Sequence, residues 1–241
     1  MKILLFGTRG QVGWELQRSL ASLGELITLD LGSTSLCGDL ADLQGLAESV
    51  RTVGPDVIVN AAAYTAVDKA ESEPDLARLI NATAPGILAQ EADKLGAWLV
   101  HYSTDYVFDG SGTQPWVESD PTGPLNVYGK TKLEGEQLVA ANCKKHLIFR
   151  TSWVYAARGD NFAKTILRLA EEQESLTVVN DQIGAPTEAG LLADVTAHAI
   201  RCVLSSLEHN SLIPSGIYHV VSSGYISWHG YARFVLEAAH K

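Results

Sequence analysis

The sequence contains little cysteine. Among 241 residues there are three, Cys37, Cys143 and Cys202, and they lie far apart. An odd number of widely spaced cysteines argues against a disulfide framework, and no Cys-x-x-Cys pair is available to bind zinc. The chain therefore has to fold around a hydrophobic core, for which its length and its 46% of hydrophobic residues are sufficient.

Positive charge is also scarce. Eighteen Lys and Arg residues stand against 28 Asp and Glu residues, which gives a formal net charge of −10. A net negative chain binds nucleic acids and anionic membrane surfaces poorly. We therefore expect neither as a partner, although local backbone donors and single cations still allow an anionic small molecule to bind.

Long apolar runs are absent. The apolar run near the N-terminus covers only residues 3–6, which is too short for a signal peptide. The longest uncharged stretch, residues 210–228, is interrupted by Pro214, Gly216 and Gly224, so it does not fit a membrane span. We expect a cytoplasmic protein.

Short apolar runs alternate with segments of helical periodicity in the first 150 residues. We expect strands at 3–6, 26–29, 57–59, 98–102 and 146–149, and helices at 12–23, 43–53, 74–95 and 127–140. Strands that are apolar almost throughout are typical of parallel sheets covered on both faces. The pattern predicts an α/β fold with a doubly wound, Rossmann-type parallel sheet.

The pattern loosens after residue 150. Expected helices at 162–172, 191–204 and 227–240 are separated by polar loops and by strand-like pieces at 176–179 and 217–220. We assign residues 1–150 to a dinucleotide-binding domain, to which some later segments return. Residues 151–241 form mostly a smaller substrate-binding region.

A glycine-rich segment lies between the first expected strand and the first expected helix. Its spacing is Gly-x-x-Gly-x-x-Gly, which permits a tight turn and close approach of the backbone to a pyrophosphate. The helix that follows offers free N–H groups. An isolated glycine triplet also fits a flexible turn, but this position favours a dinucleotide site. The cofactor-binding residues predicted here are Gly7, Gly10, Gln11, Val12 and Gly13.

Acidic residues after the second expected strand bear on the choice of cofactor. A carboxylate at Asp30 can accept hydrogen bonds from the adenosine ribose and repels a 2′-phosphate, which favours NADH. Asp30 can equally act as a strand-end cap, and Arg9 offers a cation to a phosphate, so the choice between NADH and NADPH stays open. We also place Asp39 and Leu40 beside the adenine.

Tyr128 and Lys132 form a Tyr-x-x-x-Lys pair in the helix expected at 127–140. Residues at i and i+4 lie on one face of a helix, so the phenol and the ammonium can face one ligand. A nearby cation lowers the pKa of a phenol and makes it a better proton shuttle. The spacing alone is weak evidence, because a chain with 8 tyrosines can contain such a pair by chance.

Polar and small residues at two other strand ends strengthen the evidence that Tyr128 and Lys132 belong to a catalytic site. Thr104 follows the fourth expected strand, at the edge where ligands of open α/β sheets bind, and its hydroxyl can hydrogen-bond a substrate carbonyl. Ser103 is a less favoured candidate for the same role, and strand-end capping is the alternative for both. Ala62 and Ala63 follow the third expected strand, where small residues let a nicotinamide or ribose lie close to the backbone.

These residues together resemble the extended short-chain dehydrogenase/reductase superfamily and, within it, the dTDP-4-dehydrorhamnose reductase family. The most discriminating strings are Asn-Ala-Ala-Ala-Tyr-Thr-Ala-Val-Asp-Lys-Ala-Glu at 60–71 and Ser-Thr-Asp-Tyr-Val-Phe-Asp-Gly at 103–110. The matching segments run almost from end to end. The 4,6-dehydratases of the superfamily typically have an acidic pair after the threonine, whereas here Asp105 precedes Tyr106.

The resemblance implies reduction of dTDP-4-dehydro-L-rhamnose (dTDP-6-deoxy-L-lyxo-4-hexulose) to dTDP-L-rhamnose, with hydride from NADPH or NADH. Tyr128 is implied as the proton donor and as a contact of the cofactor, Lys132 as the residue that holds the nicotinamide ribose, and Thr104 as the group that polarises the carbonyl. The further substrate-binding residues implied are Thr65, Val67, Tyr106 and Trp153, for which ordinary core packing of Trp153 is the alternative. A polar loop at 180–187 matches the position where the family contacts the nucleotide.

The resemblance is imperfect at two places. Some family members form a homodimer with Mg²⁺ between acidic residues of both subunits. Glu15 matches one of those positions, but Gly190 occupies another, with Glu188 two residues away, so a metal and a homodimer remain open. The family also normally continues beyond the last expected helix, so we expect the substrate-binding region to be incomplete (truncated).

Two other functions share parts of this pattern. A sugar-nucleotide epimerase would retain NAD and show no net redox change. A non-catalytic relative with this fold is a regulatory subunit of methionine adenosyltransferase, and such a protein need not keep the Tyr128, Lys132 and Thr104 set. A measurement of net cofactor oxidation separates both from a reductase.

Overall fold

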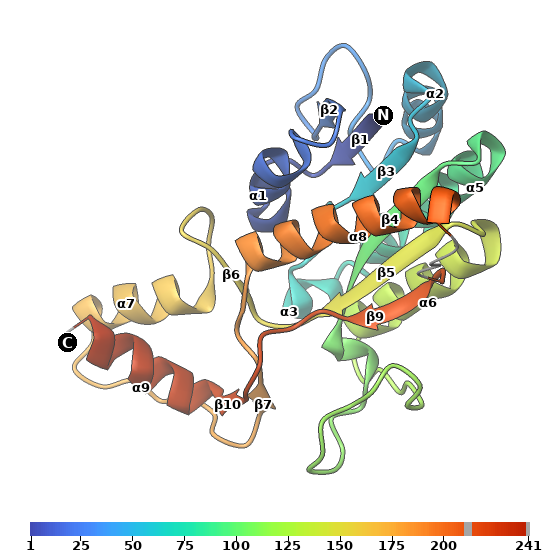
Figure 1. Cartoon of the computed structure of the whole chain (residues 1–241). Coiled ribbons are helices and arrows are strands. Elements are labelled where there is room, and N and C mark those ends of the chain that lie inside the picture. Colours follow the sequence, from blue (N-terminus) through green and yellow to red (C-terminus); the bar gives the residue numbers. More distant parts are fainter. Residues whose placement is uncertain (210–213, 240–241) are drawn as a thin grey trace.

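The computed structural model describes residues 1–209 and 214–239. Six parallel strands form a central sheet flanked by helices (Figure 1). The sheet strands are β1 (Lys2–Phe6), β2 (Glu25–Leu29), β3 (Val57–Asn60), β4 (Trp98–Thr104), β5 (His146–Thr151) and β9 (Gly216–His219). The flanking helices are α1 (Gln11–Leu20), α2 (Leu43–Val53), α5 (Ala84–Leu95), α6 (Val127–Asn142) and α8 (Ala189–His209).

The strand order places a ligand crevice next to the glycine-rich segment. The order is β2-β1-β3-β4-β5-β9, so the chain leaves β1 for one side of the sheet and later returns to β3 on the other. Open α/β sheets bind ligands at the carboxyl ends of the strands beside such a switch point. The expected doubly wound, Rossmann-type sheet is confirmed, and it gains β9 from the late part of the chain.

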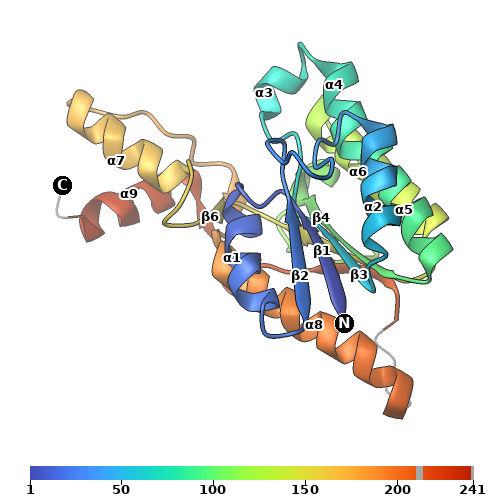
Figure 2. The same cartoon turned by 90° about the horizontal axis from the view of Figure 1, so that it is seen from above.

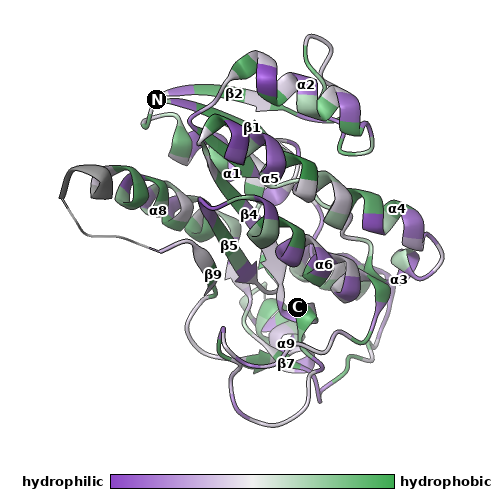
Figure 3. Ribbon diagram, turned by 90° about the vertical axis from the view of Figure 1, so that its right-hand side faces the viewer, coloured by the Kyte–Doolittle hydropathy of each residue, from purple (hydrophilic) through white to green (hydrophobic). Residues whose placement is uncertain are grey.

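Two hydrophobic clusters hold the layers together. On one face, α1 and α8 pack against the sheet through Leu16, Leu20 and Ile200, while α2, α5 and α6 cover the other face (Figure 2). The ribbons of β4 and β5 are largely green, which means hydrophobic, in Figure 3. Helix ends follow local chemistry, because Asp42 caps the start of α2 and glycines in the left-handed conformation, Gly54 and Gly96, end α2 and α5.

The helical stretch expected at 74–95 is confirmed, with one irregularity that the sequence pattern did not predict. The chain runs without a break through α4 (Pro74–Arg78), a π-helical turn (Leu79–Thr83) and α5. Pro85 has no N–H to give the carbonyl four residues earlier, and its ring crowds that carbonyl. Ala84 accordingly donates its N–H to the oxygen of Leu79, which is the wider hydrogen-bonding pattern of a π-turn.

The late part of the chain also forms a small lobe beside the sheet. It contains α7 (Phe162–Glu172), α9 (Trp228–Ala238) and four two-residue strands, β6 (Val154–Tyr155), β7 (Ile183–Gly184), β8 (Thr187–Glu188) and β10 (Ile226–Ser227). Figure 1 shows α7 and α9 side by side, away from the main sheet, and stacked aromatic rings join them, such as Phe162 on Tyr231. The final helix is thus confirmed over its described part; residues 240 and 241 lie outside the described residues.

The strand expected at 176–179 is wrong. These residues form an irregular segment, and Val179 is half exposed. A short run of β-branched and apolar residues does not reveal whether a partner strand is available, and here the Val179 carbonyl oxygen accepts from the N–H of His229 in α9. The piece expected at 217–220, in contrast, pairs with β5 as β9.

Within the described residues, no helix is both long enough and apolar enough to cross a membrane.

Candidate active site

The glycine-rich segment is packed backbone against backbone. Gly7 has φ +85°, and a Cβ there would lie 2.5 Å from the backbone nitrogen of Ala62, just after β3. A Cβ at Gly13 would collide with the carbonyl oxygen of Gly7. Gly10 begins α1 without a side-chain cap, so the N–H groups of Gln11, Val12 and Gly13 in the first turn face out of the helix end. The segment fits a pyrophosphate, which needs close backbone approach and free N–H donors.

This packing predicts a selective loss of cofactor affinity. Gly7→Ala should weaken binding of NADH or NADPH at least tenfold, because the new methyl group displaces the Ala62 backbone that forms the wall of the crevice. Titration of the reduced cofactor by its fluorescence measures the effect. Gly112→Ala is a matched control, since Gly112 has φ +84° but open space around it. Equal affinity for the cofactor in both variants would mean that the glycine-rich segment does not bind it.

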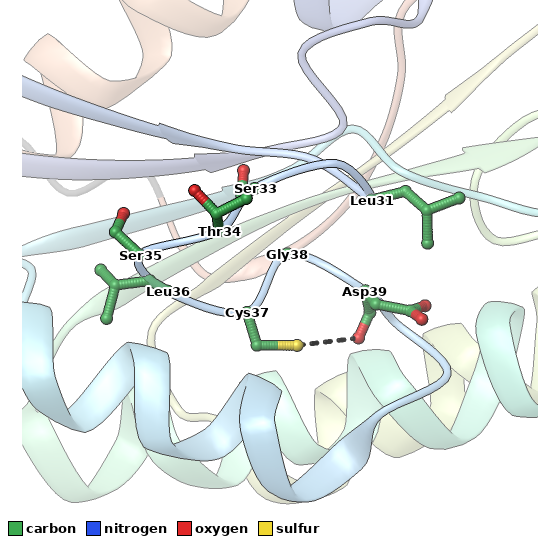
Figure 4. A pocket seen from close by; sticks show the side chains of 8 residues that line it. All are labelled: Leu31, Ser33, Thr34, Ser35, Leu36, Cys37, Gly38 and Asp39. Atoms are coloured by element: carbon green, nitrogen blue, oxygen red, sulfur yellow. Dashed lines mark hydrogen bonds between the residues drawn. The ribbon is translucent and has the colours of Figure 1, made fainter.

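A cavity lies beside the carboxyl end of β2. It encloses about 270 Å³ and is lined by residues 31 and 33–39 (Figure 4). At its edge, Asp30 accepts hydrogen bonds from the N–H of Gly32 at 2.7 Å and from the hydroxyl of Thr8 at 3.3 Å. Asp39 lines the cavity, whereas the side chain of Leu40 is buried in the hydrophobic core. The hollow is of a kind that can receive an adenosine, with Asp30 and Asp39 at its rim.

Thr104 and Tyr128 come together at the end of β4. The Thr104 hydroxyl donates to Asp105 at 3.0 Å and accepts from the N–H of Tyr106 at 3.2 Å. Burial raises the pKa of the Asp105 carboxyl to about 6, although the Thr104 hydrogen bond opposes the shift. Tyr106 packs edge-on against Tyr128, with ring centroids 5.5 Å apart. Thr104, Tyr106 and Tyr128, which were predicted as site residues, are therefore neighbours.

A close helix approach makes this arrangement possible. Asn126 caps the start of α6 by accepting from the N–H of Gly129 at 2.7 Å. At Gly129 a Cβ would collide with the carbonyl oxygen of Tyr106, so only glycine lets the first turn of α6 rest on that backbone. Tyr128 is thereby held at the carboxyl edge of the sheet.

The expected effect of Lys132 on the Tyr128 pKa is wrong for this structure. Desolvation raises the pKa of the Tyr128 phenol well above its ordinary value, and only the Thr104 side chain opposes the shift. Lys132, which is 2% exposed, donates instead to the carbonyl oxygen of Tyr102 at 2.6 Å. The phenol is therefore fully protonated at neutral pH, the state that a proton donor needs.

Sequence reasoning missed the residues that fix the loop after β3. Asn81, in the π-turn, accepts from the N–H of Tyr64 at 2.9 Å and donates to its carbonyl oxygen at 3.0 Å. Thr65, which is exposed, and Val67, which is half-buried and begins α3 (Val67–Ala70), follow directly after this loop. No local pattern around Asn81 marks it, because its partners come from another element.

Trp153 lies in the small lobe. Its indole stacks on that of Trp228 with ring centroids 3.5 Å apart, and the backbone has φ +48°, which is unusual for a residue other than glycine. Ser152, the preceding residue, is held by a hydrogen bond to the Ala185 carbonyl oxygen. An indole fixed in this way can serve as a flat apolar wall, and its role beside the sugar stays a prediction.

The candidate metal ligands do not form a cluster. Within residues 1–209 and 214–239 there is no group of three or more His, Cys, Asp and Glu side chains that could hold a metal ion. Glu15 lies 3.7 Å from Arg18 in an ion pair, and Glu188 accepts from the N–H of Leu191 at the start of α8. Magnesium binding and a homodimer, both left open by the sequence, stay open.

The chain is similar to known proteins over its whole length. The family model described as RmlD substrate binding domain matches residues 1–241. A dTDP-4-dehydrorhamnose reductase of Salmonella typhimurium is 62% identical over 241 residues, which are all of this chain and 79% of that protein. One from Burkholderia thailandensis is 50% identical over 238 residues, covering 99% of this chain and 78% of that protein.

A solved structure agrees with these relatives. The dTDP-4-dehydrorhamnose reductase of Bacillus anthracis in complex with NADP is 36% identical and superposes with a TM-score of 0.88, covering 99% of this chain and 80% of that chain. The sequence identities and the shared fold lead to one conclusion: the chain belongs to the RmlD substrate binding domain family.

Proposed function

We propose that this protein reduces dTDP-4-dehydro-L-rhamnose to dTDP-L-rhamnose with NADPH or NADH as the hydride donor. The proposal is supported above all by the placement of Tyr128, Thr104 and Lys132 at one edge of the sheet, next to the backbone-packed glycine segment. A dinucleotide at that segment and a keto sugar at Tyr128 would share the same crevice. The curated relatives with this name give the substrate class.

The residues divide the work as follows. The N–H groups at Gln11, Val12 and Gly13 would hold the pyrophosphate, with Gly7 and Gly10 shaping the turn. Asp30, Asp39 and the backbone at Leu40 would hold the adenosine, and Ala62, Ala63 and Lys132 would border the nicotinamide ribose. The reduced nicotinamide supplies the hydride when bound.

On the substrate side, Tyr128 donates its phenolic proton to the oxygen that becomes the new hydroxyl. Thr104 would polarise the same oxygen by turning its hydroxyl proton, which it donates to Asp105 in this structure, toward the substrate. Thr65, Val67, Tyr106 and Trp153 border the sugar. Positioning and proton transfer are thus the contribution of the protein.

The test is an assay of cofactor oxidation with purified protein. Loss of the absorbance of NADPH or NADH on addition of the 4-keto dTDP sugar, with dTDP-L-rhamnose as product, is the expected result. A sugar-nucleotide epimerase would change the sugar without net oxidation of the cofactor. A protein that binds both ligands without turnover, and in which Tyr128→Phe and Lys132→Met change nothing, would be a scaffold.

Asp30 offers a test of cofactor choice. Asp30→Asn should lower affinity for NADH about tenfold, because the ribose loses a hydrogen bond to a charged group, and should affect NADPH less. The amide oxygen can still accept from the N–H of Gly32, so a role as a strand-end cap is preserved. The ratio of kcat/KM for the two cofactors is the measurement. An unchanged ratio would assign Asp30 to capping alone.

A further inference from the structure

A buried histidine touches the catalytic lysine. His101, in the interior of β4, is 1% exposed, and its Nε2 lies 3.4 Å from Nζ of Lys132. Its other ring nitrogen, Nδ1, lies 3.2 Å from the side-chain nitrogen Nδ2 of Asn60, at the end of β3. Both nitrogens of the ring are therefore in contact with nitrogen atoms.

Asn60 determines which ring nitrogen carries the proton. The side-chain oxygen of Asn60 accepts from the N–H of Ala62 at 3.2 Å, so its amide nitrogen faces His101. An amide nitrogen only donates, so Nδ1 has to accept. Burial, with a smaller effect of the Lys132 charge, lowers the pKa of His101 well below its ordinary value, and the ring is neutral. Its single proton is thus on Nε2 and points toward Lys132.

This tautomer makes the surroundings of Lys132 unfavourable for a positive charge. An ammonium group only donates, so it forms no hydrogen bond with the Nε2–H of His101, whereas a neutral amine can accept from it. The remaining contact of the amine is the carbonyl oxygen of Tyr102 at 2.6 Å. Holding the amine on that oxygen fixes its position at the edge of the sheet.

Burial and the charged groups near Lys132 oppose each other in setting its pKa. Glu136, one turn later in α6, favours the ammonium, but it is itself held by Arg150 of β5 through two hydrogen bonds of 2.9 and 2.7 Å. Burial outweighs this attraction and lowers the pKa of Lys132 to about 8.

We propose that His101 is a positioning residue for Lys132: in the tautomer that Asn60 imposes, it holds the amine against the Tyr102 carbonyl and favours release of the amine's proton. Its importance for catalysis rests on the proposed function, in which Lys132 serves the reaction. The contacts themselves do not depend on that function.

The first measurement needs no substitution. The ¹⁵N chemical shifts of the His101 ring in labelled protein report its tautomer directly. We expect a neutral ring with the proton on Nε2. A ring protonated on Nδ1, or a charged ring at pH 7, would overturn the proposal, because Lys132 would then not face a donor from a neutral histidine.

The second measurement follows the titration of Lys132 by the ¹³Cε shift of labelled lysine, assigned by its loss in Lys132→Met. His101→Gln replaces the Nε2–H with a side chain whose carbonyl oxygen can accept from the ammonium. The midpoint should therefore rise by about one pH unit, in line with a hydrogen bond to a charged group. His146→Gln is the matched control, since His146 is also buried, in the neighbouring β5, but contacts the Cys143 carbonyl oxygen and not Lys132. An unchanged midpoint in His101→Gln, or an equal shift in His146→Gln, would contradict the proposal.

Activity provides a separate readout. Under the proposed function, loss of the Lys132 proton should lower kcat at high pH. In His101→Gln this fall should move to higher pH together with the Lys132 midpoint, while KM for the dTDP sugar stays the same. A purely structural role would lower thermal stability without moving the pH profile. If the unsubstituted protein oxidises no cofactor at all, the proposed function fails, and the lysine titration still decides whether His101 controls Lys132.

Discussion

Replacing Tyr128 with phenylalanine should lower kcat by about two to four orders of magnitude, as expected for loss of a general acid. The ring and its edge-on packing against Tyr106 are retained, so affinity for the cofactor should change little. The measurement is steady-state oxidation of the reduced cofactor with the 4-keto dTDP sugar, together with a fluorescence titration of the cofactor alone. Because desolvation keeps the phenol protonated, the loss should be similar across the neutral range.

Tyr218→Phe is a suitable control for that experiment. Tyr218 lies in β9 and donates its hydroxyl proton to the Pro214 carbonyl oxygen at 2.6 Å, away from the Tyr128 edge. The Tyr218→Phe variant should keep the kcat of the unsubstituted protein. A decrease of less than tenfold in Tyr128→Phe would mean that another group supplies the proton.

Replacing Arg150 with methionine should lower the free energy of unfolding by about 3–5 kcal/mol, because it leaves the carboxylate of Glu136 buried without a partner. The two side chains are 4% and 1% exposed and join in a bidentate pair. Urea unfolding followed by circular dichroism measures the change.

Two further variants test whether the buried charge or the lost packing causes the decrease in stability. The double variant Glu136→Met, Arg150→Met removes both charges and should recover most of the lost stability, since buried pairs can be replaced by apolar side chains at little cost. Arg168→Met breaks an exposed pair with Glu172 and should cost less than about 1 kcal/mol. If the double variant is as unstable as Arg150→Met, packing rather than charge explains the loss.

Local sequence signals predicted those elements whose boundaries depend on nearby residues. The helix at 43–53 has the expected bounds because Asp42 and Gly54 supply its start and end, and α7 matches for similar reasons, with Asn161 as its N-cap. The helical stretch expected at 74–95 is also confirmed, but the π-turn between α4 and α5, just before Pro85, was not predicted because apolar periodicity does not report a local change of hydrogen-bonding pattern.

Non-local contacts explain the remaining differences. The Tyr-x-x-x-Lys spacing indicated a pair on one helix face, but the pKa values of both side chains are set by burial. His101 and Arg150 come from strands that only the sheet order brings beside α6. The partner of β9 is likewise β5, about 70 residues earlier, which periodicity alone does not identify.

The crevice beside β1 and β2 has a consequence for protein engineering. Its glycine segment is built from backbone contacts, such as Gly7 against Ala62, so a library of substitutions there would mostly yield defective proteins. The adjoining hollow is lined instead by short side chains, including Ser33, Thr34 and Ser35 (Figure 4). Directed evolution of cofactor preference should therefore randomise residues 33–35 and keep residues 7–13 constant.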